Sequence, residues 1–290
     1  MSAAIIDGRA AAARIRQSLN PRIEALVKAR GRAPRLSILS AAGDPSAAAY
    51  LQAKLKACRD SGIEADVHAL SASAGHDEAL DLLRRLGSDD AVDAVIVEFP
   101  LPKAVKAGEF IRELPAAKDV EGVTPENLGR LFMAKTFEEI LSRKLIVPCT
   151  AMAAIGLLRQ TGVPIAGRRA VVVGRSSIVG GPAAHLLTSL NATVTLCHSQ
   201  TQDIEGELAC ADIVIAAIGR ARFIKGSWLK KGAVVIDAGI NRDGDSLCGD
   251  VDFEQASQVA SLITPVPGGV GPVTTAMLLA NTVALTESRL

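Results

Sequence analysis

Tyr50 and Lys54 are the first two side chains in this sequence whose types and spacing could do chemistry. The stretch GDPSAAAYLQAKLKACRDSG has Asp44 as the expected N-cap and Gly62 as a stop, which predicts a helix over 45–60. Residues four apart share one face of a helix, so the side chains of Tyr50 and Lys54 can face the same cleft. The alternative is a half-buried aromatic side chain beside a solvated lysine.

Three carboxylates follow that could complete such a site. The run DAVIVEF predicts a strand ending near Glu98, and open α/β sheets bind ligands at the carboxyl ends of their strands. Glu98 is therefore well placed to meet Lys54. Asp119 and Glu121 lie in a turn before a short helix expected near 126–133. Either of them could bind a substrate, or could instead belong to a solvated turn or cap a helix.

A second kind of chemistry is indicated by the run AVVVGRSSIVGGP at 170–182, which reads as a strand, a glycine turn and a helix. This order brings backbone N–H groups and the positive end of a helix towards a pyrophosphate. The glycines Gly174 and Gly180 stand six apart, which differs from the usual dinucleotide-binding spacing. A glycine turn that binds no ligand is the alternative.

The choice between NAD and NADP depends on the end of the next strand. NAD-binding folds usually place Asp or Glu there, but this sequence has TVTLCHSQT, with Ser199 and no carboxylate. Arg175 can approach from the glycine turn and pair with a phosphate, which favours NADP. Ordinary turn chemistry is the alternative for Ser199. Farther on, Ile240 of the DAGIN motif could lie against the nicotinamide side.

The loop TPVPGGVGP at 264–272 precedes an apolar helix expected over 271–287. Consecutive glycines allow the backbone to approach a flat ligand closely. The alternative is a tight connection between two domains.

The elements that must position these residues alternate between strands and helices. A βαβα rhythm before residue 100 and a second series from 169 predict two successive α/β units, each with a parallel sheet covered by helices on both faces. The linker is expected around 140–150, and the last helix is expected to pack back on the first domain.

Composition excludes several classes of function. Among 290 residues, 32 Lys and Arg stand against 31 Asp and Glu, which leaves no surplus charge for nucleic acid. Charged residues interrupt every apolar run, and the first residues do not resemble a secretory signal, so we expect a cytoplasmic protein without membrane contact. Five scattered cysteines and four scattered histidines indicate reduced thiols and no metal site.

Several of these segments together resemble the bifunctional methylenetetrahydrofolate dehydrogenase and methenyltetrahydrofolate cyclohydrolase family, in order and spacing, from IDG at 6–8 to NT at 281–282. The segments that carry the resemblance are Tyr50 with Lys54, PLP at 100–102, GRSSIVGGP, HSQT, DAGIN, GDVDF and PVPGGVGP.

The resemblance implies a homodimer with a folate cleft between a catalytic domain, formed by 1–145 and 270–290, and a Rossmann-type NADP domain, 146–269. It implies NADP-dependent oxidation of 5,10-methylenetetrahydrofolate and hydrolysis of the methenyl product to 10-formyltetrahydrofolate. By position it assigns catalysis to Lys54, Tyr50 and Glu98. It assigns NADP binding to Gly174, Arg175, Ser176, Ser199 and Ile240. It assigns substrate binding to Tyr50, Leu101, Glu121, Pro267, Gly268, Gly269 and Val270.

The sequence departs from the family's common pattern in the inferred folate site. Glu98 stands where Gln is common, and Glu121 stands where Asp is common. An ionised Glu98 would favour the charged form of Lys54 and deplete the free amine that a base needs. We therefore expect weakened cyclohydrolase activity. The rival interpretations are a folate-binding protein without turnover and another two-domain NADP enzyme of the shikimate dehydrogenase type.

Overall fold

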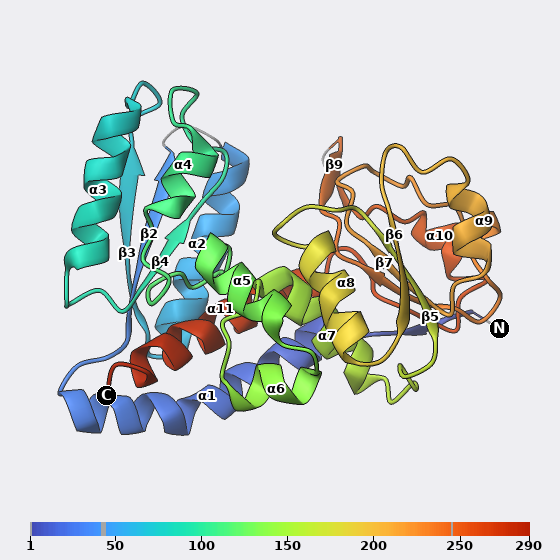
Figure 1. Cartoon of the computed structure of the whole chain (residues 1–290), viewed down its shortest axis with the longest axis horizontal. Helices are drawn as coiled ribbons and strands as arrows, with labels where there is room; N and C mark the ends of the chain where they lie inside the picture. The colour runs from blue at the N-terminus through green and yellow to red at the C-terminus, as the bar shows by residue number, and fades with distance from the viewer. Residues whose placement is uncertain (1, 42–44, 245) are drawn as a thin grey trace. The chain divides into compact units, whose positions relative to one another are not determined.

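The computed structural model describes the backbone of residues 2–41, 45–244 and 246–290, and the side chains of these residues except 45–50. The chain divides into two compact α/β units (Figure 1). Unit 1 comprises Met1–Ala13 and Leu131–Met277, and unit 2 comprises Arg14–Arg130 and Leu278–Leu290. Two α/β units with parallel sheets confirm the predicted fold class.

Unit 1 contains a six-stranded parallel sheet with the order β1-β11-β8-β7-β5-β6. Its strands are β1 (Ala4–Ile5), β5 (Arg169–Val173), β6 (Thr193–Cys197), β7 (Ile213–Ala216), β8 (Val234–Asp237) and β11 (Leu262–Ile263). From β5 the chain first adds β6 on one side and then crosses back to add β7 on the other. The strand order therefore reverses between β5 and β7, and such a switch point is where open α/β sheets bind ligands.

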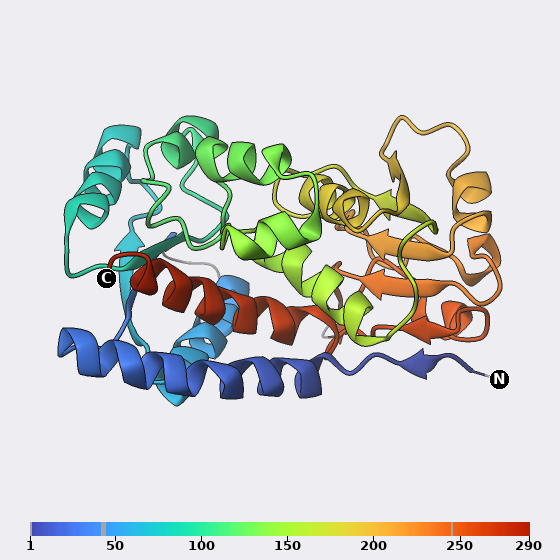
Figure 2. The ribbon, with the colours of Figure 1, turned by 60° about the horizontal axis from the view of Figure 1, so that its bottom comes forward.

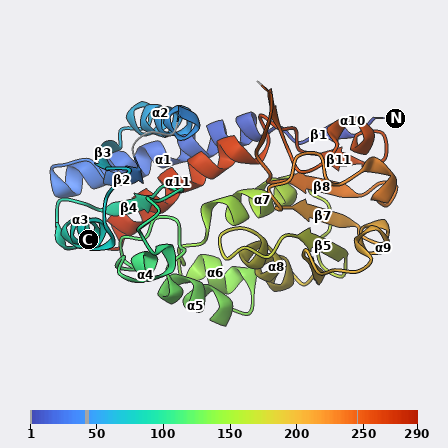
Figure 3. The same ribbon diagram turned by 90° about the horizontal axis from the view of Figure 1, so that it is seen from above.

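Helices cover both faces of this sheet. The helical elements of unit 1 are α6 (Phe137–Ser142), α7 (Cys149–Gln160), α8 (Gly180–Ser189), α9 (Ile204–Ala209), η1 (Gly226–Trp228) and α10 (Phe253–Ala256). The helices α7 and α8 pack on one face, while α9, α10 and η1 cover the other (Figure 3). A hairpin of β9 (Asn241–Asp243) and β10 (Ser246–Cys248) follows β8. The central strands β5, β7 and β8 are buried almost throughout, as parallel strands covered on both faces must be.

Unit 2 contains a three-stranded parallel sheet with the order β3-β2-β4. Its elements are β2 (Arg35–Ala41), α2 (Pro45–Asp60), β3 (Glu64–Leu70), α3 (His76–Ser88), β4 (Ala94–Val97), α4 (Ala107–Arg112) and α5 (Pro125–Met133). The chain adds β3 on one side of β2 and β4 on the other. Right-handed crossovers then place α2 and α3 on opposite faces of the sheet (Figure 3). The α3 face of the sheet carries an apolar core centred on Leu39, Leu83, Val95 and Phe110.

Two long helices contribute residues to both units. They are α1 (Gly8–Arg30), which enters unit 2 at Arg14, and α11 (Val270–Glu287), which enters it at Leu278. Figure 2 shows α1 in blue and the C-terminal part of α11 in red lying side by side, and Arg22 forms a bidentate ion pair with Glu287 at 2.8 Å within unit 2.

The predicted helices at 45–60, near 126–133 and at 271–287 agree with α2, α5 and α11. The expected N-cap Asp44 lies outside the described residues. The two-residue strand β1 was not predicted, because so short a run carries no alternation. No helix in the described part of the chain has the length and apolar character needed to cross a membrane.

Candidate active site

Lys54 and Glu98 form an ion pair in unit 2. Lys54 lies on α2, and Glu98 is the first residue after β4. The backbone N–H of Glu98 donates to the carbonyl of Leu39 at 2.8 Å, which fixes Glu98 between the ends of β2 and β4, where the strand order reverses. Both side chains are only partly exposed, 19% for Lys54 and 20% for Glu98. The predicted approach of Glu98 to Lys54 is therefore present in the structure.

Asp119 and Glu121 occupy the turn before α5 and differ in their surroundings. Asp119 is buried, and its Oδ2 accepts hydrogen bonds from Thr124 N at 2.8 Å and Asn127 Nδ2 at 2.9 Å. Asp119 thus holds the start of α5, in agreement with the helix-cap alternative.

Glu121 is the carboxylate in this site whose pKa is shifted by its surroundings. Burial raises the pKa of Glu121 to about 7; the positive charge of Lys54 opposes this shift, and the charges of Glu98 and Asp119 add to it. Lys54, Glu98 and Glu121 therefore form one electrostatically coupled group in which Glu121 can carry a proton near neutral pH.

Two other predicted substrate residues belong to unit 2. Tyr50 lies one turn before Lys54 on α2, and its side chain lies outside the described residues. Leu101 packs against the apolar core under α3 and α4, so packing alone can explain its residue type.

In unit 1 the predicted cofactor residues gather at the carboxyl edge of the sheet. Gly174 ends β5 with φ of +117°, and a Cβ there would lie 2.0 Å from the carbonyl oxygen of Ala217, which follows β7. A Cβ on Gly180 would lie 1.8 Å from the carbonyl oxygen of Gly174. The absence of both side chains lets the start of α8 pack directly on the glycine turn, at the switch point between β5 and β7.

Arg175 and Ser199 lie at neighbouring strand ends, each two residues beyond the paired residues Val173 and Cys197. Both side chains are exposed. Ser176 has a local role, because its Oγ accepts from Val179 N at 3.1 Å and so shapes the turn into α8.

The remaining predicted residues of unit 1 follow β8 and β11. Ile240 is 46% exposed despite being apolar. In the loop Pro267, Gly268, Gly269 and Val270, a Cβ on Gly269 would lie 2.5 Å from the carbonyl oxygen of Pro265. A Cβ on Gly8, at the start of α1, would lie 1.7 Å from the carbonyl oxygen of Gly269. The glycines at both ends of the sequence are therefore needed for one close backbone contact within unit 1.

Asp237 and Asp250 were not predicted as site residues, although they belong to the motifs DAGIN and GDVDF. Both carboxylates are buried beside the carboxyl edge of the unit 1 sheet. Burial raises the pKa of Asp237 to about 7; backbone N–H bonds from Val251 and Asp250 oppose this shift, and the charge of Asp250 adds to it. A carboxylate inside an otherwise apolar strand end was the signal that could have found them.

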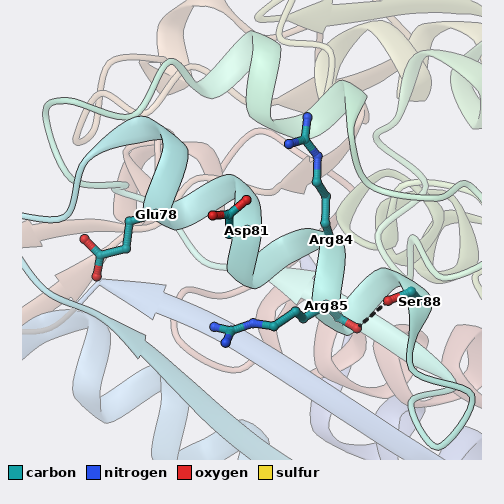
Figure 4. A pocket seen from close by; sticks show the side chains of 5 residues that line it. All are labelled: Glu78, Asp81, Arg84, Arg85 and Ser88. Carbon is teal, nitrogen blue, oxygen red and sulfur yellow. Dashed lines mark hydrogen bonds between the residues drawn. The ribbon is translucent and has the colours of Figure 1, made fainter.

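The surface hollow on α3 holds none of the predicted residues. It is lined by Glu78, Asp81, Arg84, Arg85 and Ser88, whose side chains extend from α3 in several directions (Figure 4). Nowhere in the described residues do three or more His, Cys, Asp or Glu side chains gather as metal ligands would.

Unit 1 has a glycine turn at the switch point of a parallel sheet, and unit 2 presents a lysine paired with a carboxylate. Together these features define a two-unit enzyme of the dinucleotide-dependent class. Two family models match the chain: the tetrahydrofolate dehydrogenase/cyclohydrolase catalytic domain over residues 6–121, and the NAD(P)-binding domain of the same family over 148–290. The chain belongs to the tetrahydrofolate dehydrogenase/cyclohydrolase family.

Individual relatives agree with this membership along the whole chain. The bifunctional protein FolD of Geotalea daltonii is 44% identical over 288 residues, covering 99% of this chain and all of that protein. Among solved structures, the bifunctional FolD enzyme of Campylobacter jejuni superposes with a TM-score of 0.93 at 36% identity, covering both chains fully. The Trypanosoma brucei methylenetetrahydrofolate dehydrogenase-cyclohydrolase, solved with NADP and an inhibitor, gives 0.92 at 36% identity, covering 100% of this chain and 99% of that one.

These likenesses confirm the family predicted from the sequence and the assignment of the chain as an enzyme. They favour neither the shikimate-type alternative nor a binding protein without turnover.

Proposed function

We propose that this protein oxidises 5,10-methylenetetrahydrofolate with NADP and hydrolyses the resulting 5,10-methenyltetrahydrofolate to 10-formyltetrahydrofolate. The observation that carries the proposal is the Lys54–Glu98 pair at the switch point of unit 2, in a chain that matches its family over both units. We further propose 1–145 with 270–290 as the catalytic domain and 146–269 as the NADP domain.

NADP fits the carboxyl edge of unit 1. The close packing at Gly174 and Gly180 sets the glycine turn at the carboxyl edge of the sheet, beside the positive end of α8, where a pyrophosphate is stabilised. The end of β6 presents Ser199 and no carboxylate, and Arg175 is exposed beside it, as a ribose phosphate requires. Ser176 and Ile240 complete the proposed set. When bound, NADP supplies the acceptor for the hydride that the substrate loses.

The residues proposed to bind the folate substrate are assigned by their sequence positions in the family. They are Tyr50, Leu101 and Glu121 in unit 2 and Pro267, Gly268, Gly269 and Val270 in unit 1. Lys54, as a free amine, takes the proton from the water that opens the methenyl bridge. Tyr50 is assigned to hold the folate ring system, and Glu98 to control the charge of Lys54.

The Lys54–Glu98 ion pair supports weakened hydrolysis. A carboxylate paired with an ammonium group stabilises the ammonium form, which cannot accept a proton. Dehydrogenation depends mainly on how the methylene bridge is held, so the ion pair affects it less.

We propose that the protein is a cytoplasmic homodimer. Support for a reducing compartment comes from the five cysteines, none of which forms a disulfide in the described residues and four of which are buried. Support for a second copy comes from the edge strand β6, where Leu196 is 39% exposed and Thr193 and Thr195 are also exposed. Light scattering coupled to size exclusion tests the dimer.

The function is tested with a spectrophotometric assay on methylenetetrahydrofolate and either nicotinamide cofactor. We expect turnover with a higher kcat/KM for NADP than for NAD. Equal or better use of NAD would show that Arg175 and Ser199 form no phosphate site. No turnover with either cofactor would instead favour a folate-binding protein without enzymatic activity.

A further inference from the structure

A buried carboxylate, Asp250, lies directly beneath the loop that follows β7. Its Oδ2 accepts hydrogen bonds from Ile218 N at 2.6 Å and Gly219 N at 3.0 Å, and its Oδ1 accepts one from Arg220 N at 2.9 Å. Asp250 itself is 0% exposed. Three successive backbone amides therefore point at one carboxylate, an arrangement that fixes the backbone that donates to it.

The same carboxylate also holds the turn that carries Ile240. The Nδ2 of Asn241 donates to Asp250 Oδ1 at 2.8 Å. On the other side of Ile240, a Cβ on Gly239 would lie 2.2 Å from Asp250 Cγ, so this position packs against the carboxylate without a side chain. Both neighbours of the exposed Ile240 are thus held by one residue.

Asp250 is in turn fixed by Asp237 at the end of β8. Asp237 Oδ1 accepts from Asp250 N at 3.1 Å, and its Oδ2 accepts from Val251 N at 2.9 Å. A Cβ on Gly249 would lie 1.9 Å from Asp237 Oδ2. The two aspartates therefore hold each other in place. Asp237 packs against Gly249, which precedes Asp250, and Asp250 packs against Gly239, which lies two residues after Asp237.

The hydrogen bonds to Asp250 are more than the fold needs in order to satisfy the backbone amides of the 218–220 loop. Gly219 and Arg220 are exposed, so water could satisfy their amides without any carboxylate below them. Burying a carboxylate costs free energy unless its bonds compensate, and here they order a loop that faces solvent. That loop borders the switch point, since Ala217 O is the atom that a Cβ on Gly174 would meet.

We propose that Asp250 is a positioning residue for the nicotinamide cofactor, holding the 218–220 loop and the Ile240 turn in the single arrangement that binds it. The proposal rests on the proposed binding of NADP at this edge of unit 1. Without Asp250 the two segments sample several arrangements, and the apparent affinity falls with the fraction that is competent.

The test compares Asp250→Asn with the parent protein by calorimetric titration with NADP. Each carboxylate oxygen of Asp250 accepts two of the four bonds, so replacing one oxygen with an NH2 group loses two of them. We expect the Kd for NADP and the KM for NADP to rise about tenfold or more. Hydrogen exchange of the 217–221 amides should become faster, while the KM for the folate substrate changes little.

Asp252→Asn is the matched control. It makes the same chemical change two residues away. The side chain of Asp252 caps α10 by accepting a hydrogen bond from Gln255 N at 3.3 Å, and the amide oxygen of Asn can accept the same bond. Its NADP affinity should equal that of the parent.

The outcomes separate the two proposals. A parent protein that does not bind NADP refutes the proposed function. A parent that binds, together with a folded Asp250→Asn that binds equally well and exchanges its loop amides no faster, overturns the positioning role. If Asp250→Asn does not fold, Asn241→Leu removes only the side-chain donor. A Kd raised several-fold would then support the proposal, and an unchanged Kd would overturn it.

Discussion

At the scale of single residues, Lys54 is the side chain on which turnover should depend. It pairs with Glu98 and is not part of the apolar core, so Lys54→Met should leave thermal unfolding nearly unchanged. Removing a positioned general base lowers the rate by about 10² to 10⁴. We expect a loss of this size in cyclohydrolase turnover, measured beside the melting temperature. Full activity, or a large drop in melting temperature, would contradict the assignment.

Glu98 should limit hydrolysis through its ion pair with Lys54. Glu98→Gln removes the carboxylate that stabilises the ammonium form of Lys54, so it should raise the cyclohydrolase rate near neutrality by up to about tenfold. Dehydrogenase activity should change less. Both rates are to be followed from about pH 6 to about 9.5 in parent and variant. A parent that hydrolyses the methenyl compound as fast as it forms it, with no gain in the variant, rules the idea out.

Glu121 should make the free energy of unfolding depend on pH. Its pKa, about 7 in the folded protein, is raised above the ordinary value of 4.5 by burial, so the folded state binds more protons between these values. Stability from this group is present below about pH 4.5 and is lost as the pH rises through 7. Relative to Glu121→Gln, the parent should lose about 1 to 3 kcal/mol between about pH 5 and 8. Parallel denaturation curves at the two pH values would show that Glu121 ionises normally.

At the scale of elements, the start of α8 depends on one glycine for its contact with the turn after β5. In Gly180→Ala the new Cβ would lie 1.8 Å from a backbone oxygen that cannot move aside, so α8 must shift. We expect destabilisation by about 1 to 3 kcal/mol, as for overpacked cores, and weaker NADP binding. The neighbouring change Gly181→Ala is the control, since its Cβ would meet Ser176 O at 3.3 Å. Similar melting temperatures for the two variants would contradict the packing argument.

The elements around the site were predictable where local signals agreed. The helix over 45–60 and the strand before Glu98 followed from apolar runs and stops, and the ends of parallel strands then brought Glu98 to Lys54. Asp250 could not be predicted in this way. Its partners at 218–220 lie about thirty residues earlier, and only the folded sheet brings those amides above it. The strand β1 was missed because two residues carry no alternation, and its pairing partner β11 lies far away in the sequence.

At the scale of the whole molecule, residues near the start of the chain complete a sheet built mainly from its second half. Ala4 N donates to Ser261 O at 2.8 Å, and Ile6 N donates to Ile263 O at 2.9 Å. Deleting residues 2–5 would leave β11 as an open edge, so we expect a lower melting temperature and concentration-dependent association. Ile5→Thr, which keeps the backbone pairing and alters a side chain that is 52% exposed, should behave as the parent does. If the variant that lacks residues 2–5 is as stable and monodisperse as Ile5→Thr, then β1 is dispensable.

The pairing of β1 with β11 also affects how the protein is made. Ala4 pairs with Leu262, so 258 residues separate the partners. At a synthesis rate of roughly 5 to 20 residues per second, the first strand waits about 13 to 50 s on the ribosome before its neighbour exists. During that interval unit 2 already has all three of its strands, whereas the unit 1 sheet is incomplete on the β11 side. The N-terminal segment must therefore stay unpaired until β11 has been synthesised, and anything that captures it earlier would delay completion of the sheet.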